Sequence, residues 1–142
     1  MDRIVVGVDG SEAAHDALRW AAAEAVVHGA KLRIVHAWQY PFVGVSAYGG
    51  MAIDPVDVET GARELLDKAI ARVDLSGLVA PPDIVCTGHS PAAALVDAAE
   101  GADLLVVGSR GRGGFGGLLL GSVSQQVANH AACPIVIIRH QA

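Results

Sequence analysis

A glycine-rich segment, residues 108–122, is the part of the chain whose residue types point most clearly to chemistry. It reads GSRGRGGFGGLLLGS and holds seven of the chain's 17 glycines together with two arginines and no acid. Each glycine loses more backbone freedom on folding than any other residue. So dense a run therefore indicates that something approaches this backbone closely, and the arginines favour an anion.

Charge is distributed unevenly along the chain, although its formal total is −5. All 15 acidic residues lie at or before Asp103, and the cations that follow it are Arg110, Arg112 and Arg139. The negative total argues against a general nucleic-acid binder. The locally positive C-terminal part favours an anionic ligand near the glycine-rich segment.

The glycine-rich segment does not fit two common phosphate-binding motifs, the dinucleotide fingerprint and the P-loop. Gly111, Gly113 and Gly116 form a literal GxGxxG, but a dinucleotide site also needs an acid about 20 residues later. No acid follows Asp103. A P-loop needs GxxxxGK[ST], and both lysines of the chain lie far from any glycine-rich segment, so that motif is excluded.

Residues 88–92, GHSPA, resemble the nucleophile elbow of hydrolases. In that mechanism the residue after the nucleophile donates its backbone N–H to the oxyanion. Pro91 stands at that position and has no N–H. The pattern instead predicts that Ser90 caps a helix whose first residue is Pro91.

Histidines and cysteines show no metal-binding spacing. His36, near the end of a predicted strand, is interpreted as a hydrogen-bonded core histidine. Cys86 and Cys133 are far apart and are interpreted as unpaired core thiols, which are typical of a reducing compartment.

Strand-like and helix-like segments alternate around these motifs. The predicted strands cover residues 4–8, 31–38, 83–87, 104–107 and 134–139. The predicted helices cover residues 12–28, about 57–74, 91–101, and a last helix capped by Ser122 with Gln125 as its capping-box partner. Residues 40–55 are predicted to form a surface loop or flap. This alternation predicts one α/β domain with a five-stranded parallel sheet and helices on both faces.

Short motifs at the predicted strand ends carry a family resemblance. They are residues 7–11 (GVDGS), 35–37 (VHA), 106–111 (VVGSRG), 133–138 (CPIVII) and the spacing Gly108-x2-Gly111-x9-Gly121-Ser122. As an ordered set this resembles the universal stress protein family over essentially the whole chain, residues 1–142. The complete glycine spacing is similar to that of the ATP-binding branch. The resemblance implies a Rossmann-like open sheet of strand order 3-2-1-4-5 and a homodimer.

In that strand order the site is expected where the order reverses, between the first and fourth strands, because ligands of open parallel sheets bind there outside the strands' carboxyl ends. Those two strands lead into Asp9 and into the glycine-rich segment. The predicted nucleotide-binding residues are Val8, Asp9, Gly10, Ser11, Ala37, Val107, Gly108, Arg110, Gly111, Arg112, Gly121, Ser122 and Val123.

Each group of these residues has an expected role. Gly108 and Gly111 are expected to leave room for ribose and phosphate, and Gly121 to let a phosphate reach the N-terminus of the last helix. Asp9 is expected to accept a ribose hydroxyl or to help hold Mg²⁺ or Mn²⁺ with the phosphates. The backbone of Ala37 would read the adenine edge.

The remaining predicted residues form walls or carry charge. Val8, Val107 and Val123 are expected to be apolar walls, and Ser122 to cap the last helix or donate to a phosphate. Arg110 and Arg112 either reach the phosphates or remain solvated, and the sequence leaves both interpretations open.

Two classes of function follow. The favoured one is an ATP-binding regulatory protein of the stress response, with a protein partner that the sequence does not name. The alternative is a slow ATPase or nucleotidyl-transferring enzyme, for which no catalytic residue is assigned, or a protein that binds another adenine nucleotide such as cyclic AMP.

Association and location are predicted from the ends of the chain. The apolar run at residues 135–138 is expected to pair two chains into a homodimer. The N-terminus lacks the apolar run of a signal peptide, and no stretch is apolar for membrane-spanning length. We expect a cytoplasmic protein without nucleic-acid or membrane partners.

Overall fold

The computed structural model describes residues 1–38, 54–110 and 120–140 of the 142-residue chain. The flap predicted at residues 40–55 therefore lies almost entirely outside the described residues. Gly111 and Arg112, two of the predicted binding residues, lie outside them as well.

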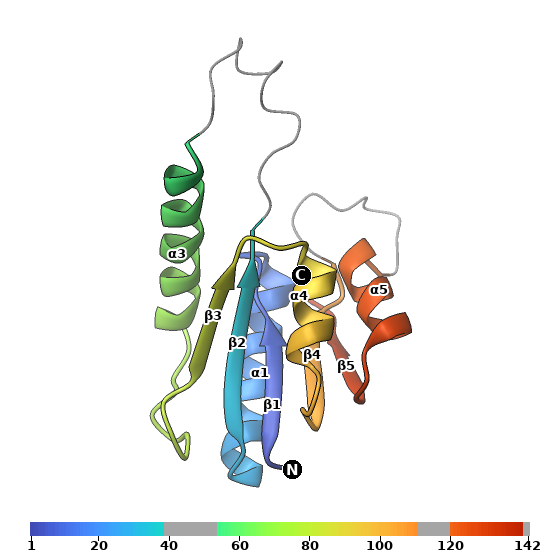
Figure 1. Ribbon diagram of the computed structural model, residues 1–142. Helices are drawn as coiled ribbons and strands as arrows, with labels where there is room; N and C mark the ends of the chain where they lie inside the picture. Colours follow the sequence, from blue (N-terminus) through green and yellow to red (C-terminus); the bar gives the residue numbers. More distant parts are fainter. Residues whose placement is uncertain (39–53, 111–119, 141–142) are drawn as a thin grey trace.

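A parallel sheet forms the centre of the described structure (Figure 1), with its strands in the order β3-β2-β1-β4-β5. The strands are β1 (Arg3–Gly7), β2 (Lys31–Ala37), β3 (Asp83–Thr87), β4 (Leu104–Gly108) and β5 (Ile135–Ile138). Val6 in β1 pairs with Ile34 on one side and with Val106 on the other. The predicted fold class and strand order are confirmed.

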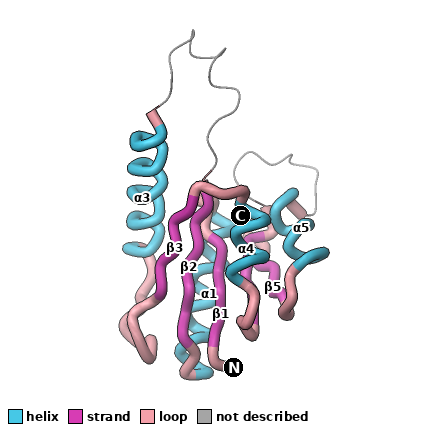
Figure 2. Tube along the Cα trace, in the orientation of Figure 1, coloured by secondary structure: helices cyan, strands magenta, loops and turns pink. Residues whose placement is uncertain are grey.

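Helices cover both faces of this sheet (Figures 1 and 2). They are α1 (Glu12–His28), α3 (Pro55–Ala71), α4 (Pro91–Ala98) and α5 (Ser122–His130). The predicted bounds of α1 are confirmed. The prediction for α3 started two residues late and ended three residues late. Asp54 is its N-cap and accepts a hydrogen bond from the Val56 N–H at 2.9 Å, so the helix begins at Pro55.

The two faces of the sheet bury separate apolar clusters, because successive strand residues point to opposite sides. Ile4 and Val6 pack on the face that α1 and α3 cover, with Leu18 of α1 and Leu66 of α3. Val5 packs on the opposite face with Leu95 of α4 and with Val127 of α5. Both clusters are made mainly of small and branched aliphatic residues.

Serine caps fix where α1 and α4 begin. The Ser11 hydroxyl accepts a hydrogen bond from Ala14 N at 3.1 Å, and the Ser90 hydroxyl accepts one from Ala93 N at 3.3 Å. Pro91 is the first residue of α4. The helix-cap interpretation of residues 88–92 is therefore confirmed.

Both cysteines are free thiols at the margins of the core. Cys86 packs against the cluster on the α1 face and Cys133 against the cluster on the α4 face. Burial raises the pKa of both thiols. Their interpretation as unpaired packing residues agrees with this placement.

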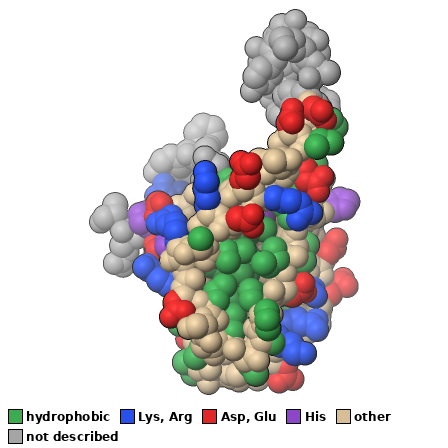
Figure 3. Space-filling view, turned by 90° about the vertical axis from the view of Figure 1, so that its left-hand side faces the viewer, with side chains coloured by type: hydrophobic (Ala, Val, Ile, Leu, Met, Phe, Trp, Pro, Cys, Tyr) green, Lys and Arg blue, Asp and Glu red, His purple; other side chains and the backbone are tan. Residues whose placement is uncertain are grey.

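The β3 side of the molecule presents apolar surface (Figure 3), where hydrophobic side chains gather at the centre of the face and charged side chains surround them. Ile84 in β3, a strand at one edge of the sheet, is 48% exposed. Within the described ranges, no helix has the length and apolar character needed to cross a membrane.

Candidate functional site

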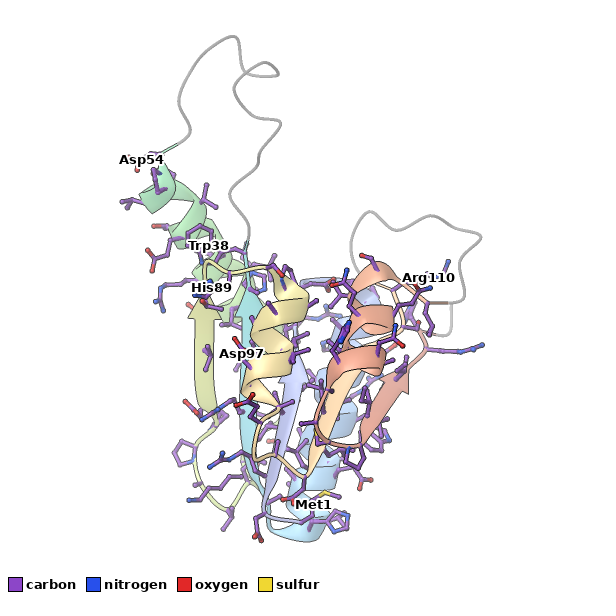
Figure 4. All side chains as sticks on the ribbon, turned by 45° about the vertical axis from the view of Figure 1, so that its right-hand side comes forward. Met1, Trp38, Asp54, His89, Asp97 and Arg110 are labelled. Carbon is purple, nitrogen blue, oxygen red and sulfur yellow. The ribbon has the colours of Figure 1, made fainter. Side chains whose placement is uncertain are left out.

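A cavity of about 380 Å³ opens at the carboxyl ends of β1 and β4, where the strand order reverses. Most of the predicted binding residues that the structure describes line it, namely Val8, Asp9, Ser11, Ala37, Val107, Gly108, Arg110, Gly121, Ser122 and Val123. Arg110 lies beside α5, across this edge of the sheet from Trp38 and His89 (Figure 4). The strand ends thus bring together residues that are far apart in the sequence.

Gly10 is an exception among the predicted residues. It lies outside the cavity lining and instead lines a second groove with residues of α3. Its φ is +85°, and a Cβ built on it would lie 2.9 Å from Leu65 Cδ1. Glycine is required at this position by the turn and by the packing of α3.

The structure adds lining residues that the sequence reasoning missed: Gly7, Ala14, Val35, His36, Leu65, Pro91, Leu95 and Ser124. Val35 and His36 adjoin Ala37 in a motif that was already singled out, so that motif gave a usable signal. Leu65 and Leu95 come from α3 and α4, and only the packing of these helices brings them to the cavity.

The turn after β1 is organised by Asp9 and Ser11. Asp9 Oδ1 accepts hydrogen bonds from Ser11 N at 2.9 Å and from Ser11 Oγ at 2.5 Å. The same hydroxyl caps α1 and also lies 3.5 Å from the carbonyl oxygen of Arg110. One serine therefore links the carboxylate, the helix start and the far side of the cavity.

His36 fixes the end of β1 from the neighbouring strand. Its side chain is buried, and Nδ1 lies 2.6 Å from the carbonyl oxygen of Val8. Because a carbonyl can only accept, Nδ1 carries the hydrogen of this bond. Val8 N also donates to Val35 O at 2.8 Å. His36 is a hydrogen-bonded core histidine, as interpreted, and it lines the cavity as well.

Gly108 has a different reason to be glycine from the one expected. A Cβ at this position would lie 2.8 Å from Ala13 C and from Ala14 N, both in the backbone of α1. A side chain here would push α1 away from β4. Gly108 does line the cavity, but the close approach of a helix, rather than of a ligand, is what excludes a side chain.

The start of α5 corrects the capping-box prediction. Gly121 is the N-cap, with φ −74° and ψ 170°, and no side chain caps this helix. Ser122 is the first helical residue, and Gln125 Nε2 donates to Leu120 O at 3.4 Å instead of completing a box. With Gly121 as the N-cap, the third helical residue is Ser124 and Gln125 is the fourth, so Gln125 is not at the capping-box position.

The lining is chemically divided between its contributing elements. β2, α3 and α4 contribute mainly apolar groups: Val35, Ala37, Leu65, Pro91 and Leu95, with His36 as the polar member. The β4–α5 region contributes mainly polar groups and bare backbone: Gly108, Arg110, Gly121, Ser122 and Ser124, beside Val107 and Val123. Such a cavity suits a ligand with a flat apolar part and an anionic part, since N–H groups at a helix start favour anions.

Comparisons with known proteins agree with this arrangement. The sequence matches the model of the Universal stress protein family over residues 1–139. The chain belongs to this family. A universal stress protein of Thermus aquaticus, encoded 3′ of a QAH/OAS sulfhydrylase gene, is 39% identical over 140 residues, which are 96% of this chain and 97% of that protein.

Other members of the universal stress protein family are longer or have been solved with a ligand. Universal stress protein Rv2623 of Mycobacterium tuberculosis is 39% identical over 144 residues, which cover 97% of this chain and 48% of that protein. The chain thus spans about half the length of this relative. The crystal structure of a universal stress protein in complex with cAMP is 30% identical, with a TM-score of 0.65 and coverage of 99% of this chain and 98% of that one.

Proposed function

We propose that this universal stress protein binds ATP in the cavity and acts as a nucleotide-dependent regulatory protein. The observation that carries the proposal is the meeting of apolar strand and helix ends with the uncapped start of α5 in one cavity of about 380 Å³. Ligand pockets typically measure about 300–1,000 Å³. The relative solved with cAMP supports an adenine nucleotide as the ligand class.

In the proposed mode of binding, the adenine ring packs among the apolar groups of β2 and α4, where the backbone of Ala37 reads its edge. Asp9 accepts a ribose hydroxyl. The phosphates lie at the start of α5 against Gly121, Ser122 and Val123, which line the cavity. Arg110, which lines the cavity, would reach the phosphates, and Gly111 and Arg112 stay predicted binding residues outside the described part of the chain.

A divalent ion would enter this site together with ATP. The described residues include no group of three or more His, Cys, Asp or Glu side chains placed to hold a metal. Mg²⁺ is commonly held by one or two carboxylates together with substrate phosphates, and Asp9 fits the part of a single carboxylate ligand. Mg²⁺ or Mn²⁺ would therefore be held by Asp9 and the ATP phosphates together, and would neutralise part of the phosphate charge.

Slow hydrolysis or nucleotidyl transfer is the alternative activity of the same site. Fast phosphoryl transfer needs a water oriented by a base or glutamine, as well as metal and positive charge. Among the described residues that line the cavity, Asp9 is the single carboxylate that could act as a base. Ser11 N already donates a hydrogen bond to one of its oxygens. We propose turnover far below the median enzyme rate of about 10 per second. A single-turnover assay giving a rate within tenfold of that median would favour the enzyme.

Cyclic AMP is the second candidate ligand, because a relative was solved with it. It lacks the extended phosphate tail of ATP. It would therefore make the same contacts with the apolar end of the cavity as ATP and fewer contacts with the start of α5. Relative affinities for ATP and cAMP therefore report which end of the cavity dominates binding.

Mass spectrometry of nucleotide that copurifies with the protein, followed by titration calorimetry, tests the proposal. We expect adenine nucleotide in the purified protein and ATP–Mg²⁺ affinity in the micromolar range, which corresponds to about −8 kcal/mol. Tighter binding of cAMP than of ATP would favour the second candidate. Absence of both heat and thermal shift with ATP, AMP and cAMP would remove the proposal.

We further propose that β5 pairs two chains into a homodimer. β5 is an edge strand, and each of its residues is half-buried within one chain. An apolar edge strand favours pairing with a second copy about a two-fold axis. Multi-angle light scattering at micromolar concentration should give the dimer mass, and a monomer mass would contradict the proposal.

A further inference from the structure

Ser124 is a buried polar residue in the first turn of α5, and only 2% of it is exposed. Its hydroxyl lies 2.9 Å from the carbonyl oxygen of Ser109 and 3.0 Å from that of Gly121. A serine hydroxyl carries one hydrogen, so the two carbonyls share a single donor. Ser124 therefore contacts the end of β4 and the start of its own helix simultaneously.

The carbonyl that Ser124 reaches across to belongs to a residue that is held from several sides. Ser109 is 5% exposed, and its N–H donates to Ile138 O, at the end of β5, at 2.8 Å. Its carbonyl also accepts from Gly121 N at 2.6 Å. Ser109 is thus a fixed point between β5 and α5, and Ser124 bonds α5 to it.

We propose that Ser124 is a positioning residue for the phosphate end of the site. Its hydroxyl sets the angle between β4 and the first turn of α5, and thereby aims the N–H groups of Ser122 and Val123 into the cavity. This inference rests on the proposed nucleotide binding and deepens it.

The energetics favour a role in orientation rather than in folding. Without the Ser124 hydroxyl, Ser109 O still accepts from Gly121 N, and Gly121 O still accepts from Gln125 N at 3.0 Å. Neither buried carbonyl is left unpaired, so the large penalty for an unsatisfied group does not arise. What disappears is the hydrogen bond of the Ser124 hydroxyl. In our proposal this bond prevents the helix start from rotating about the hydrogen bond between Gly121 N and Ser109 O.

The test compares Ser124→Ala with wild type by calorimetry against adenosine, AMP and ATP–Mg²⁺. We expect affinity for AMP and ATP to fall about tenfold, the effect of losing roughly one hydrogen bond's worth of alignment. Adenosine has no phosphate, so it does not depend on the start of α5. Its affinity for Ser124→Ala should stay within about twofold of its affinity for wild type. Ser124→Thr should restore phosphate affinity, because threonine carries the same hydroxyl group and can again donate it to the carbonyl oxygen of Ser109.

Ser90→Ala is the matched control. It also removes a serine hydroxyl at the start of a helix, but Ser90 is the N-cap of α4, its partner is Ala93 N, and it does not line the cavity. It should lower the melting temperature without separating adenosine from ATP. The melting temperature of every variant is recorded, so that a loss of fold is not read as a loss of binding.

Two outcomes overturn the inference while leaving the proposed function intact. One is unchanged ATP affinity in Ser124→Ala, and the other is an equal loss for adenosine and ATP, which marks a general structural role. If wild type binds none of the three ligands, the proposed function falls and the inference falls with it.

Discussion

Two helices, α1 and α5, begin at the same edge of the sheet and both contribute to the cavity, yet their starts differ. α1 is closed: Ser11 caps it, and the acidic residue Glu12 lies in its first turn. α5 is open: its N-cap is Gly121, no side chain caps it, and its first turn has no acidic residue. The positive end of the helix dipole is therefore offset at α1 and left exposed at α5.

The glycines near the starts of these two helices also differ in the structural reason for having no side chain. Gly10 has φ +85° and packs against Leu65, and Gly108 lies against the α1 backbone. Gly121 has φ −74°, a value that any residue adopts. Conformation and helix packing explain the first two glycines, whereas the φ of Gly121 does not require glycine. In the proposed mode of binding, a phosphate at this helix start would occupy the space of a side chain at Gly121.

Closing α5 in the way that α1 is closed should give the largest effect. Gly121→Asp places a capping carboxylate and a negative charge at the helix start, where a phosphate is proposed to lie. We expect ATP affinity to fall at least about 100-fold, as expected for losing hydrogen bonds to a charged group. The melting temperature should stay level or rise.

Calorimetry and thermal melting check this, with Gly121→Ala as the matched control. Alanine adds a Cβ without an acceptor or a charge, so its loss of ATP affinity should be much smaller. If Gly121→Asp binds ATP as wild type does, the phosphates are not at the start of α5.

Asp9 lies beside the capped start of α1, and we propose that it contacts ribose and, when ATP carries a divalent ion, that ion. Asp9→Ala should weaken AMP binding about tenfold through the lost ribose contact, and ATP–Mg²⁺ binding by at least that factor. Asp9→Asn keeps a side-chain oxygen for Ser11 and for the sugar while removing the charge, so its loss should be smaller. A loss confined to ATP–Mg²⁺ in calorimetry would instead place Asp9 on the metal.

Most of the fold follows from local signals in the sequence. The bounds of α1 follow from Ser11 and Gly29, the latter with φ +61° at the helix end. The order of strands came from the family resemblance. The start of α3 was wrong because Asp54-Pro55, a cap followed by a first-turn proline, was included in the preceding loop.

The candidate site was predictable at the strand ends and at the start of α5, but not where α3 and α4 pack against the cavity. Asp9 and Ala37 end up at the cavity because parallel strands place their carboxyl ends at one edge. Leu65 and Leu95 reach it through helix packing, for which no local pattern exists. Gly121 and Ser122 are both acceptable N-cap residues. The bond from Gly121 N to Ser109 O, made across twelve residues, decides between them.

Removing the serine cap of α1 should affect the stability of the fold more than the binding of ATP. Ser11→Ala removes the acceptor for Ala14 N and should lower the free energy of unfolding by about 1 kcal/mol. Ser11 lines the cavity, so we also expect a change in ATP affinity, but below about threefold, because the Asp9 carboxylate keeps its bond from Ser11 N. Denaturant unfolding and calorimetry measure the two effects. A large loss of ATP affinity with unchanged stability would reverse the contrast between α1 and α5.

The smallest effect should come from the ion pairs on α1, and it should depend on pH. Asp16 Oδ2 lies 2.7 Å from His140 Nδ1, and Oδ1 lies 2.8 Å from Arg19 NH2. The hydrogen bond with His140 is the main cause that lowers the pKa of Asp16 below its usual 3.8. The charges of His140 and Arg19 act in the same direction, and burial opposes them.

A lowered pKa in the folded state means that ionised Asp16 stabilises the fold fully above about pH 4, and that this contribution is lost as the pH falls through the folded-state value. Asp16→Asn should therefore melt slightly below wild type at pH 7, and the gap should close in more acidic buffer. Because Arg19 is 67% exposed and His140 40%, we expect less than about 1 kcal/mol. Ser90→Ala is the control, since the Ser90 hydroxyl accepts from the backbone N–H of Ala93 and neither group titrates in this range, so its deficit should persist across the same pH values. A gap for Asp16→Asn that stays constant into acid would show that the loss is one of packing, and that charge does not hold this flank of α1 to the C-terminal part of the chain.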